Sequence, residues 1–263
     1  MLNKQRILFG IAIFFLFINY YFLFASKASI DLNNRLASPS FTAWFGTDWL
    51  GRDLFYQTAI GLFYSLKLGI SAAIFSGIIS FIMALLASTY SPMKWGITLL
   101  IDILLSIPHL LLLIVLVLAF QNGSAGVITA VVITHWPKLT RILCNEFDGI
   151  KSCQFVALAH QFGQSPCKII YTHIVPFIIP QWLVGTLLMV PHIIMHVAGL
   201  TFLGFGVDPT RPSIGLLLSD ASRYIISGQW WLAVFPGLAL ISTLLLLSWA
   251  TQYMVAELKR RGI

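Results

Sequence analysis

The sequence predicts an all-α integral membrane protein with about six transmembrane helices, and three observations lead to this prediction. The 263 residues are 58% hydrophobic and only 10% charged, whereas a soluble domain carries about 25% charged residues. The mean hydropathy is +0.88. Apolar runs of about 20 residues, the length that crosses a bilayer, recur along the chain with polar breaks between them. We therefore expect one transmembrane domain over residues 1–263.

Six apolar runs are the expected membrane helices, with ends uncertain by a few residues. They are residues 7–25, 62–88, 98–120, 125–143, 181–205 and 230–254. The first run follows Lys4 and Arg6 and resembles a signal peptide, but it is long enough to cross a bilayer, so we expect a retained helix. The membrane core then extends over 62–254, after the polar segment 26–56.

The positions of the 16 Lys and Arg residues predict the orientation in the membrane. With six crossings, ten of them fall on the side of the two termini and segment 144–180. Five fall in segments 26–56 and 207–228, and Lys67 is ambiguous. Since the richer side is the cytoplasmic one, we expect both termini and segment 144–180 in the cytoplasm. The net charge of +7 then reflects topology and gives no reason to expect a nucleic-acid partner.

Segment 144–180 is the most polar interior part of the chain, and its pattern predicts two short helices. Residues 155–163 favour a first helix that ends at Gly163, where glycine permits a left-handed turn. Ser165 as a cap and Pro166 in the first turn favour a second helix directly afterwards. This could be an ordinary amphipathic surface segment, or a rigid element that a soluble partner moves as a unit.

The pattern resembles the cytoplasmic coupling loop, or EAA loop, of ABC importer permeases. In that family a Glu-Ala-Ala start precedes a glycine, and a His or similar residue and a proline follow. The matching positions here are Ala157, Leu158, Ala159, Gly163, His173 and Pro176. Ala157 replaces the glutamate, so any salt bridge of that glutamate is absent. The resemblance implies that these residues couple the chain to an ATPase.

Other segments extend the resemblance over nearly the whole chain after the first helix. Residues 46–53 resemble the Gly-Thr-Asp-x-x-Gly-Arg-Asp signature of peptide and nickel permeases, and residues 102–108 and 200–207 resemble the same family. The turn glycines Gly46 and Gly51, with the opposed charges that follow, suit an ordered approach to the next membrane helix.

A closer resemblance is to the C-type permease subunit of nickel importers. It rests on residues 30–39, on His135-Trp136 and on residues 191–199, where peptide permeases more often carry a glutamate in place of His196. It implies import of nickel or a related transition metal, free or chelated. The alternative within this class is a dipeptide or oligopeptide importer.

His192 and His196 are the candidate metal ligands. Because they are four residues apart in a predicted helix they share a face, and two imidazoles at this spacing can meet one Ni²⁺, Co²⁺ or Zn²⁺ ion. Met195 adds a thioether nearby. Metal contact, lining of the translocation path and a structural role all remain open. His135 and Asp102 are further path candidates, or partners in interhelical hydrogen bonds.

The resemblance also implies the partners: a second permease subunit, two ABC ATPases and an extracytoplasmic binding protein. ATP and Mg²⁺ are expected on the ATPases, because this chain has no GxxxxGK[ST] loop, and no cofactor is expected on the chain itself. A metalloprotease is one alternative class, but the glutamate of HExxH is missing between His192 and His196. A channel or a purely structural membrane protein is the other.

Overall fold

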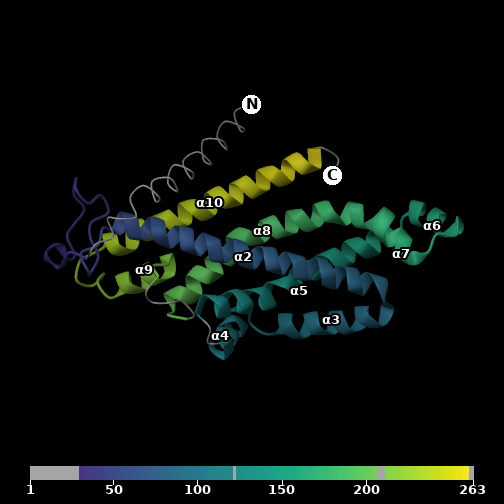
Figure 1. Cartoon of the computed structure of the whole chain (residues 1–263), viewed down its shortest axis with the longest axis horizontal. Helices are drawn as coiled ribbons and strands as arrows, with labels where there is room; N and C mark the ends of the chain where they lie inside the picture. Colours follow the sequence, from purple (N-terminus) through teal and green to yellow (C-terminus); the bar gives the residue numbers. More distant parts are fainter. Residues whose placement is uncertain (1–29, 121–122, 206–210, 261–263) are drawn as a thin grey trace. The chain divides into compact units, whose positions relative to one another are not determined.

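The computed structural model describes residues 30–120, 123–205 and 211–260, and these ranges are mostly helical (Figure 1). No strand occurs in them beyond one isolated bridge between Thr47 and Asp53. The predicted all-α class is therefore confirmed, while the predicted helix 7–25 lies outside the described residues. The elements are η2 (Leu32–Asn34), α2 (Leu54–Thr89), α3 (Ser91–Ser106), α4 (His109–Phe120), α5 (Gly123–Lys151), α6 (Gln154–Gln161), α7 (Pro166–Ile169), the π-helical η3 (Ile170–Ile174), α8 (Val175–Phe202), α9 (Ile214–Ser222) and α10 (Trp231–Arg260).

Four of the described helices are long and apolar enough to cross a membrane, and a bent pair can count as a fifth. The four are α2, α5, the run Pro166–Phe202 and Trp231–Ala256, in the places where the sequence predicts helices. Several predicted boundaries are wrong, two of them at α2 and α5. Helix α2 already begins at Leu54 because Asp53 accepts the Phe55 N–H at 2.8 Å and caps it there. Helix α5 continues to Lys151 instead of ending near 143.

The predicted helix 98–120 is broken in two. Helix α3 ends at Ser106, α4 begins at His109, and the two axes differ by 98° (Figure 1). Ile107 is extended at φ −85°, ψ 135°, as expected for a residue before a proline. Pro108 therefore ends α3 and lets the chain turn sharply.

The described chain divides into two compact units, and the division falls within α2, α5, α8 and α10. The first unit holds residues 30–69, 123–127 and Ile194–Ala250. The second holds Ile70–Phe120, Ile128–Ile193 and residues 251–260. Each has its own apolar core and is described by itself.

The core of the second unit joins α5 to the short helices that follow it. Leu143 and Phe147 of α5 pack with Val156 and Ala159 of α6 and with Ile170 of η3, all buried. Polar side chains add interhelical bonds, which are favourable where no water competes. Ser80 Oγ of α2 donates to the Trp136 carbonyl at 3.0 Å, and Trp182 Nε1 of α8 donates to the Gly77 carbonyl at 2.7 Å.

The first unit packs the segment before α2 against α9 and α10. Leu54, Ala221, Trp231 and Leu232 form a buried cluster, and Phe45 packs on it. The loop that carries Gly46 and Gly51 is ordered, and both glycines have positive φ, at +75° and +74°, as turn glycines should. The expected charge arrangement differs: Arg52 pairs with Asp48 at 2.7 Å, while Asp53 caps α2.

Candidate functional site

Residues 154–176, named here the two-helix segment, form a helix, a glycine turn and a second helix. Helix α6 ends where Gly163 takes φ +74°, the Gly163 N–H bonds the His160 carbonyl at 3.0 Å and the Gln164 N–H bonds the Ala159 carbonyl at 3.2 Å. The predicted turn is thus present. Pro166 occupies the first turn of the second helix, but the Ser165 side chain makes no capping hydrogen bond.

The second short helix is not separate from the membrane helix that the sequence predicts at 181–205. It runs through the π turn of η3 into α8, so that Pro166–Phe202 is one helical run. The π turn ends at Ile174, two residues before Pro176, which cannot donate a backbone N–H, and a π turn is one way to accommodate that loss. The two-helix segment is therefore continuous with a candidate membrane span.

The two-helix segment has one buried side and one exposed apolar side. Val156, Ala159, Ile169, Ile170 and Ile174 are buried against α5. Leu158, Tyr171 and Phe162 are 52%, 62% and 82% exposed. Of the predicted coupling residues, Ala157 and Leu158 lie on the exposed side and Ala159 on the buried side, and Gly163 forms the turn. His173 Nε2 bonds Gln164 Oε1 at 3.2 Å and so links the turn to the second helix.

Helices α3 and α5 are joined by two ion pairs. Lys94 donates to Asp148 at 2.7 Å. Arg141 donates to Asp102, which lies closer than Lys94 to the C-terminal end of α3. Asp102, a predicted path residue, thus makes an interhelical ion pair. Its side chain is 58% exposed and that of Arg141 is 44% exposed. Charged groups in a membrane protein avoid lipid, so this face is suited to water or to another protein surface.

Three histidines from three helices meet in the second unit. His135 of α5 is buried, and its ring centroid lies 4.7 Å from that of His109 and 6.0 Å from that of His192. His192 is exposed on α8, and so is Met195. His196 follows one helical turn after His192 but belongs to the first unit. His109 was not among the predicted site residues, and its only local signal is its place directly after Pro108.

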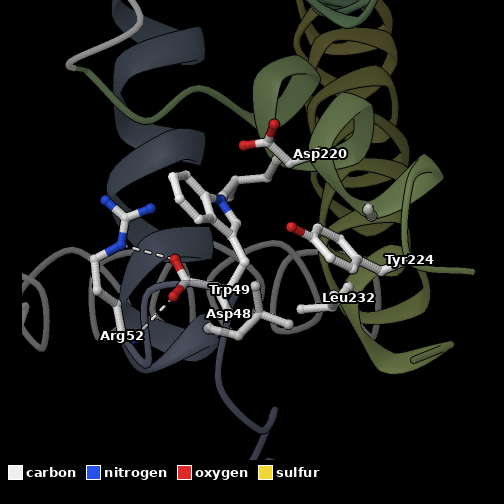
Figure 2. Close-up of a pocket in the computed structure, with 9 residues that line it drawn as sticks. Asp48, Trp49, Arg52, Asp220, Tyr224 and Leu232 are labelled. Carbon is white, nitrogen blue, oxygen red and sulfur yellow. Dashed lines mark hydrogen bonds and ion pairs between the residues drawn. The ribbon is translucent and has the colours of Figure 1, made fainter. Parts of the chain in front are cut away.

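A pocket in the first unit lies between the loop before α2 and helices α9 and α10 (Figure 2). Its lining includes Asp48, Trp49, Arg52, Leu54, Leu217, Asp220, Ala221, Tyr224 and Leu232. The cavity of about 10 Å³ holds about one water molecule, too little for a peptide. Burial raises the pKa of the Asp220 carboxyl, and Arg223 and a hydrogen bond from Trp49 partly oppose that rise. The side chains that line the pocket therefore bring the loop before α2 and helix α9 together.

Residues 76–260 match the family described as binding-protein-dependent transport system inner membrane component. The chain belongs to this family. It is an ABC importer permease and a multi-pass membrane protein.

Three relatives are peptide permeases by name. The dipeptide transport system permease protein DppC of Bacillus subtilis (strain 168) is 32% identical over 211 residues, which cover 78% of this chain and 65% of that protein. The probable D,D-dipeptide transport system permease protein DdpC of Escherichia coli (strain K12) is 30% identical over 82% of this chain and 72% of that protein. The oligopeptide transport system permease protein OppC of Bacillus subtilis (strain 168) is 32% identical over 80% and 68%. These names do not support the nickel importer subunit that residues 30–39, 135–136 and 191–199 resemble.

Solved structures agree on the fold. A chain of the MetNI methionine ABC transporter in an inward-facing conformation superposes with a TM-score of 0.63 at 14% identity, over 77% of this chain and 96% of that one. A chain of an amino acid ABC transporter gives 0.59 at 16% identity, over 78% and 94%. At these identities the likeness concerns the fold alone.

Proposed function

We propose that the chain forms one half of the translocation path of an ATP-driven importer that carries dipeptides or oligopeptides across the cytoplasmic membrane. It works with a second permease subunit, two ABC ATPases and an extracytoplasmic binding protein. The observation that carries the mechanical part is the two-helix segment, which has an exposed apolar face and is continuous with α8. The names of the peptide permease relatives support the cargo class.

The exposed face of the two-helix segment is suited to a protein partner. Fully burying a Leu or Phe side chain contributes about 1.5–3 kcal/mol, and Leu158, Phe162 and Tyr171 each still expose more than half of their surface. Covering these three side chains would therefore contribute a few kcal/mol to docking. We assign this face to an ATPase subunit.

The same segment can transmit motion because it is held rigidly. Ala159 and Ile170 are anchored in the core with Phe147 of α5, and the His173–Gln164 hydrogen bond links the turn to the second helix. A displacement of the segment would pass along the helical run Pro166–Phe202 as a rigid-body movement. ATPase closure would in this way switch access to the path between the two sides of the membrane.

The chain supplies no catalysis in this scheme, and ATP and Mg²⁺ are bound by the ATPases. Both termini and the two-helix segment face the cytoplasm, as the Lys and Arg distribution favours. Cargo would arrive from the binding protein at the opposite face, near the loop before α2.

Two native cysteines provide a test of the orientation. Cys153 precedes α6, Cys167 lies on α7, and both are exposed, while Cys144 is half-buried. A membrane-impermeant maleimide should label them in inside-out vesicles and not in right-side-out vesicles. The Cys153→Ser/Cys167→Ser variant is the control for labelling at Cys144, and bound ATPases should protect Cys153 or Cys167. Labelling from the outside would overturn the proposal.

Uptake by the complete complex in proteoliposomes tests the cargo. Labelled dipeptide should be transported only when ATP is on the side of the liposome membrane that carries the ATPases and the binding protein is on the opposite side. Unlabelled peptide should compete with the labelled dipeptide. A nickel or related metal importer is the second candidate, favoured by the histidines around His135. Uptake of Ni²⁺ without peptide competition would favour that candidate.

A further inference from the structure

Five aromatic rings of the first unit form a connected row, named here the aromatic strip. The ring of Phe45 is its centre, with its centroid 4.9 Å from that of Phe55 and 4.4 Å from that of Phe235. The ring of Trp44 lies 6.0 Å beyond Phe55, and that of Trp230 lies 6.0 Å beyond Phe235. Since Phe55 is in the first turn of α2 and Trp230 directly precedes α10, the strip joins the loop before α2 to the starts of both helices.

The two ends of the aromatic strip are exposed, while its middle is half-buried. Trp44 and Trp230 each expose more than half of their surface. Phe41, three residues before Trp44, is fully exposed, and Ile226, four residues before Trp230, is nearly so. Large apolar side chains exposed together mark an interaction surface. We therefore expect a neighbour to cover both ends of the strip.

Hydrogen-bonded turns carry the two most exposed of these side chains. In the turn of Phe41 the Ser40 N–H donates to the Ala43 carbonyl at 2.9 Å. In the turn of Ile226 the Gly228 N–H donates to the Ile225 carbonyl at 3.0 Å. Backbone groups that are bonded internally cost less to bring near lipid than open ones do. Both turns can therefore approach a bilayer.

Charge is absent from the two segments that carry most of the aromatic strip. Residues 36–47 and 224–256 contain no Asp, Glu, Lys or Arg. The charged groups Asp48, Arg52 and Asp220 of the same unit line the pocket instead. An interface with a soluble protein usually has a polar rim, whereas lipid excludes charged side chains. The absence of charge therefore favours lipid as the neighbour.

The aromatic strip also lies where two candidate membrane spans begin, at Leu54 of α2 and Trp231 of α10. From Trp230 onward, exposed apolar side chains follow at intervals of three or four residues, which places them on one side of α10. They are Val234, Leu238, Ile241 and Leu245. Tryptophan is enriched at membrane–water interfaces, where its ring lies at the level of the headgroups. Trp230 therefore stands where a lipid-facing side of α10 would reach the headgroups.

We propose that the aromatic strip, with Phe41 and Ile226 beside it, lies in the phospholipid headgroup region and is covered by lipid. The strip fixes the depth at which α2 and α10 enter the bilayer, because Phe45 joins the rings at the two helix starts. With the orientation that the Lys and Arg distribution favours, this region is the outer leaflet. The contact with lipid does not depend on which cargo the importer carries.

Quenching of tryptophan fluorescence in the complete complex, in phosphatidylcholine nanodiscs, tests this contact. The lipid quencher is phosphatidylcholine with a nitroxide on its headgroup, and iodide is the quencher in water. Trp44→Phe and Trp230→Phe should each lower the lipid-quenched fluorescence more than the iodide-quenched fluorescence, with the largest loss in the double variant. Trp49→Phe is the matched control. Its ring belongs to the same loop but lies in the pocket near Asp220 (Figure 2), so the lipid-quenched fluorescence should not change.

An added reporter keeps the test decisive if the native rings are needed for folding. Phe41→Trp introduces an indole at a fully exposed position, so no buried contact is lost, and the lipid quencher should remove more fluorescence than in the unmodified complex. A loss confined to the iodide-quenched fluorescence in the Trp44→Phe/Trp230→Phe variant would place the strip in water. No change with either quencher, in this variant and in Phe41→Trp, would place it against a protein. Either result would overturn the proposal, and neither would bear on the cargo.

Discussion

Replacing Gly163 tests the two-helix segment most directly, because its effect is limited to the backbone. Gly163 has φ +74°, and a Cβ added there would have no neighbour within 4 Å. A side chain at this position would therefore cause no steric clash with other residues. The only cost is that of a side chain in the left-handed region, about 1–2 kcal/mol for a residue such as Ala.

This free-energy cost lowers the fraction of chains in which the two-helix segment adopts its turn at residue 163. A free-energy change of 1–2 kcal/mol alters a two-state ratio by a factor of about 5–30. Gly163→Asn should be mildest, because asparagine tolerates this conformation, Gly163→Ala intermediate, and Gly163→Val most severe, because a β-branched residue is rarely found there. The segment would still dock but would transmit motion less reliably.

The assay is the number of ATP molecules hydrolysed per cargo molecule in proteoliposomes. We expect this ratio to rise in the order Asn, Ala, Val, by several-fold for Gly163→Val, while ATP hydrolysis continues. Gly149→Ala is the matched control, because Gly149 of α5 is also open to solvent but has an ordinary helical φ, so alanine there should stabilise by about 0.5–1 kcal/mol. A Gly163→Val complex as tightly coupled as the Gly149→Ala complex would refute the reasoning.

Three further predictions concern other contacts. Burial raises the pKa of Asp220 in the folded state, so the free energy of unfolding falls as pH rises from the unfolded-state pKa through the folded-state pKa. Asp220→Asn should therefore raise the midpoint of thermal unfolding at neutral pH. This increase should shrink in acid, where the carboxyl is protonated in both the folded and the unfolded state. Gly77→Ala places a methyl group 2.6 Å from Thr186 Oγ1 of α8 and should destabilise by about 1–3 kcal/mol in thermal unfolding, and Thr186→Ala should restore much of the loss. Asp102→Arg or Arg141→Asp alone should impair uptake, whereas the reversed pair should recover part of it; no recovery would contradict a role of this ion pair.

Local chemistry accounts for what the sequence predicted well. Long apolar runs must become helices in lipid, because only helices satisfy their own backbone groups there. Gly46, Gly51 and Gly163 all take positive φ, and each stands where the pattern indicates a turn. These features depend on neighbouring residues, so a single sequence contains them.

The break between α3 and α4 could not be predicted from the neighbouring residues alone. Pro108 is a visible signal, yet Pro137 remains inside α5, and Pro180 remains inside α8. A proline in a membrane helix is tolerated when neighbours satisfy the freed backbone groups. Whether it ends the helix is therefore decided by the surrounding helices, and the same break places His109 beside His135.

The sequence by itself determined the membrane class, the positions of four of the helices and the glycine turn of the two-helix segment, because apolar length and backbone preference are local properties. Only the tertiary structure decided that Arg141 pairs with Asp102 and that three histidines from three helices meet. Such contacts join residues far apart in the chain. Their partners are selected by how helices pack, and helix packing depends on the whole arrangement of side chains at once.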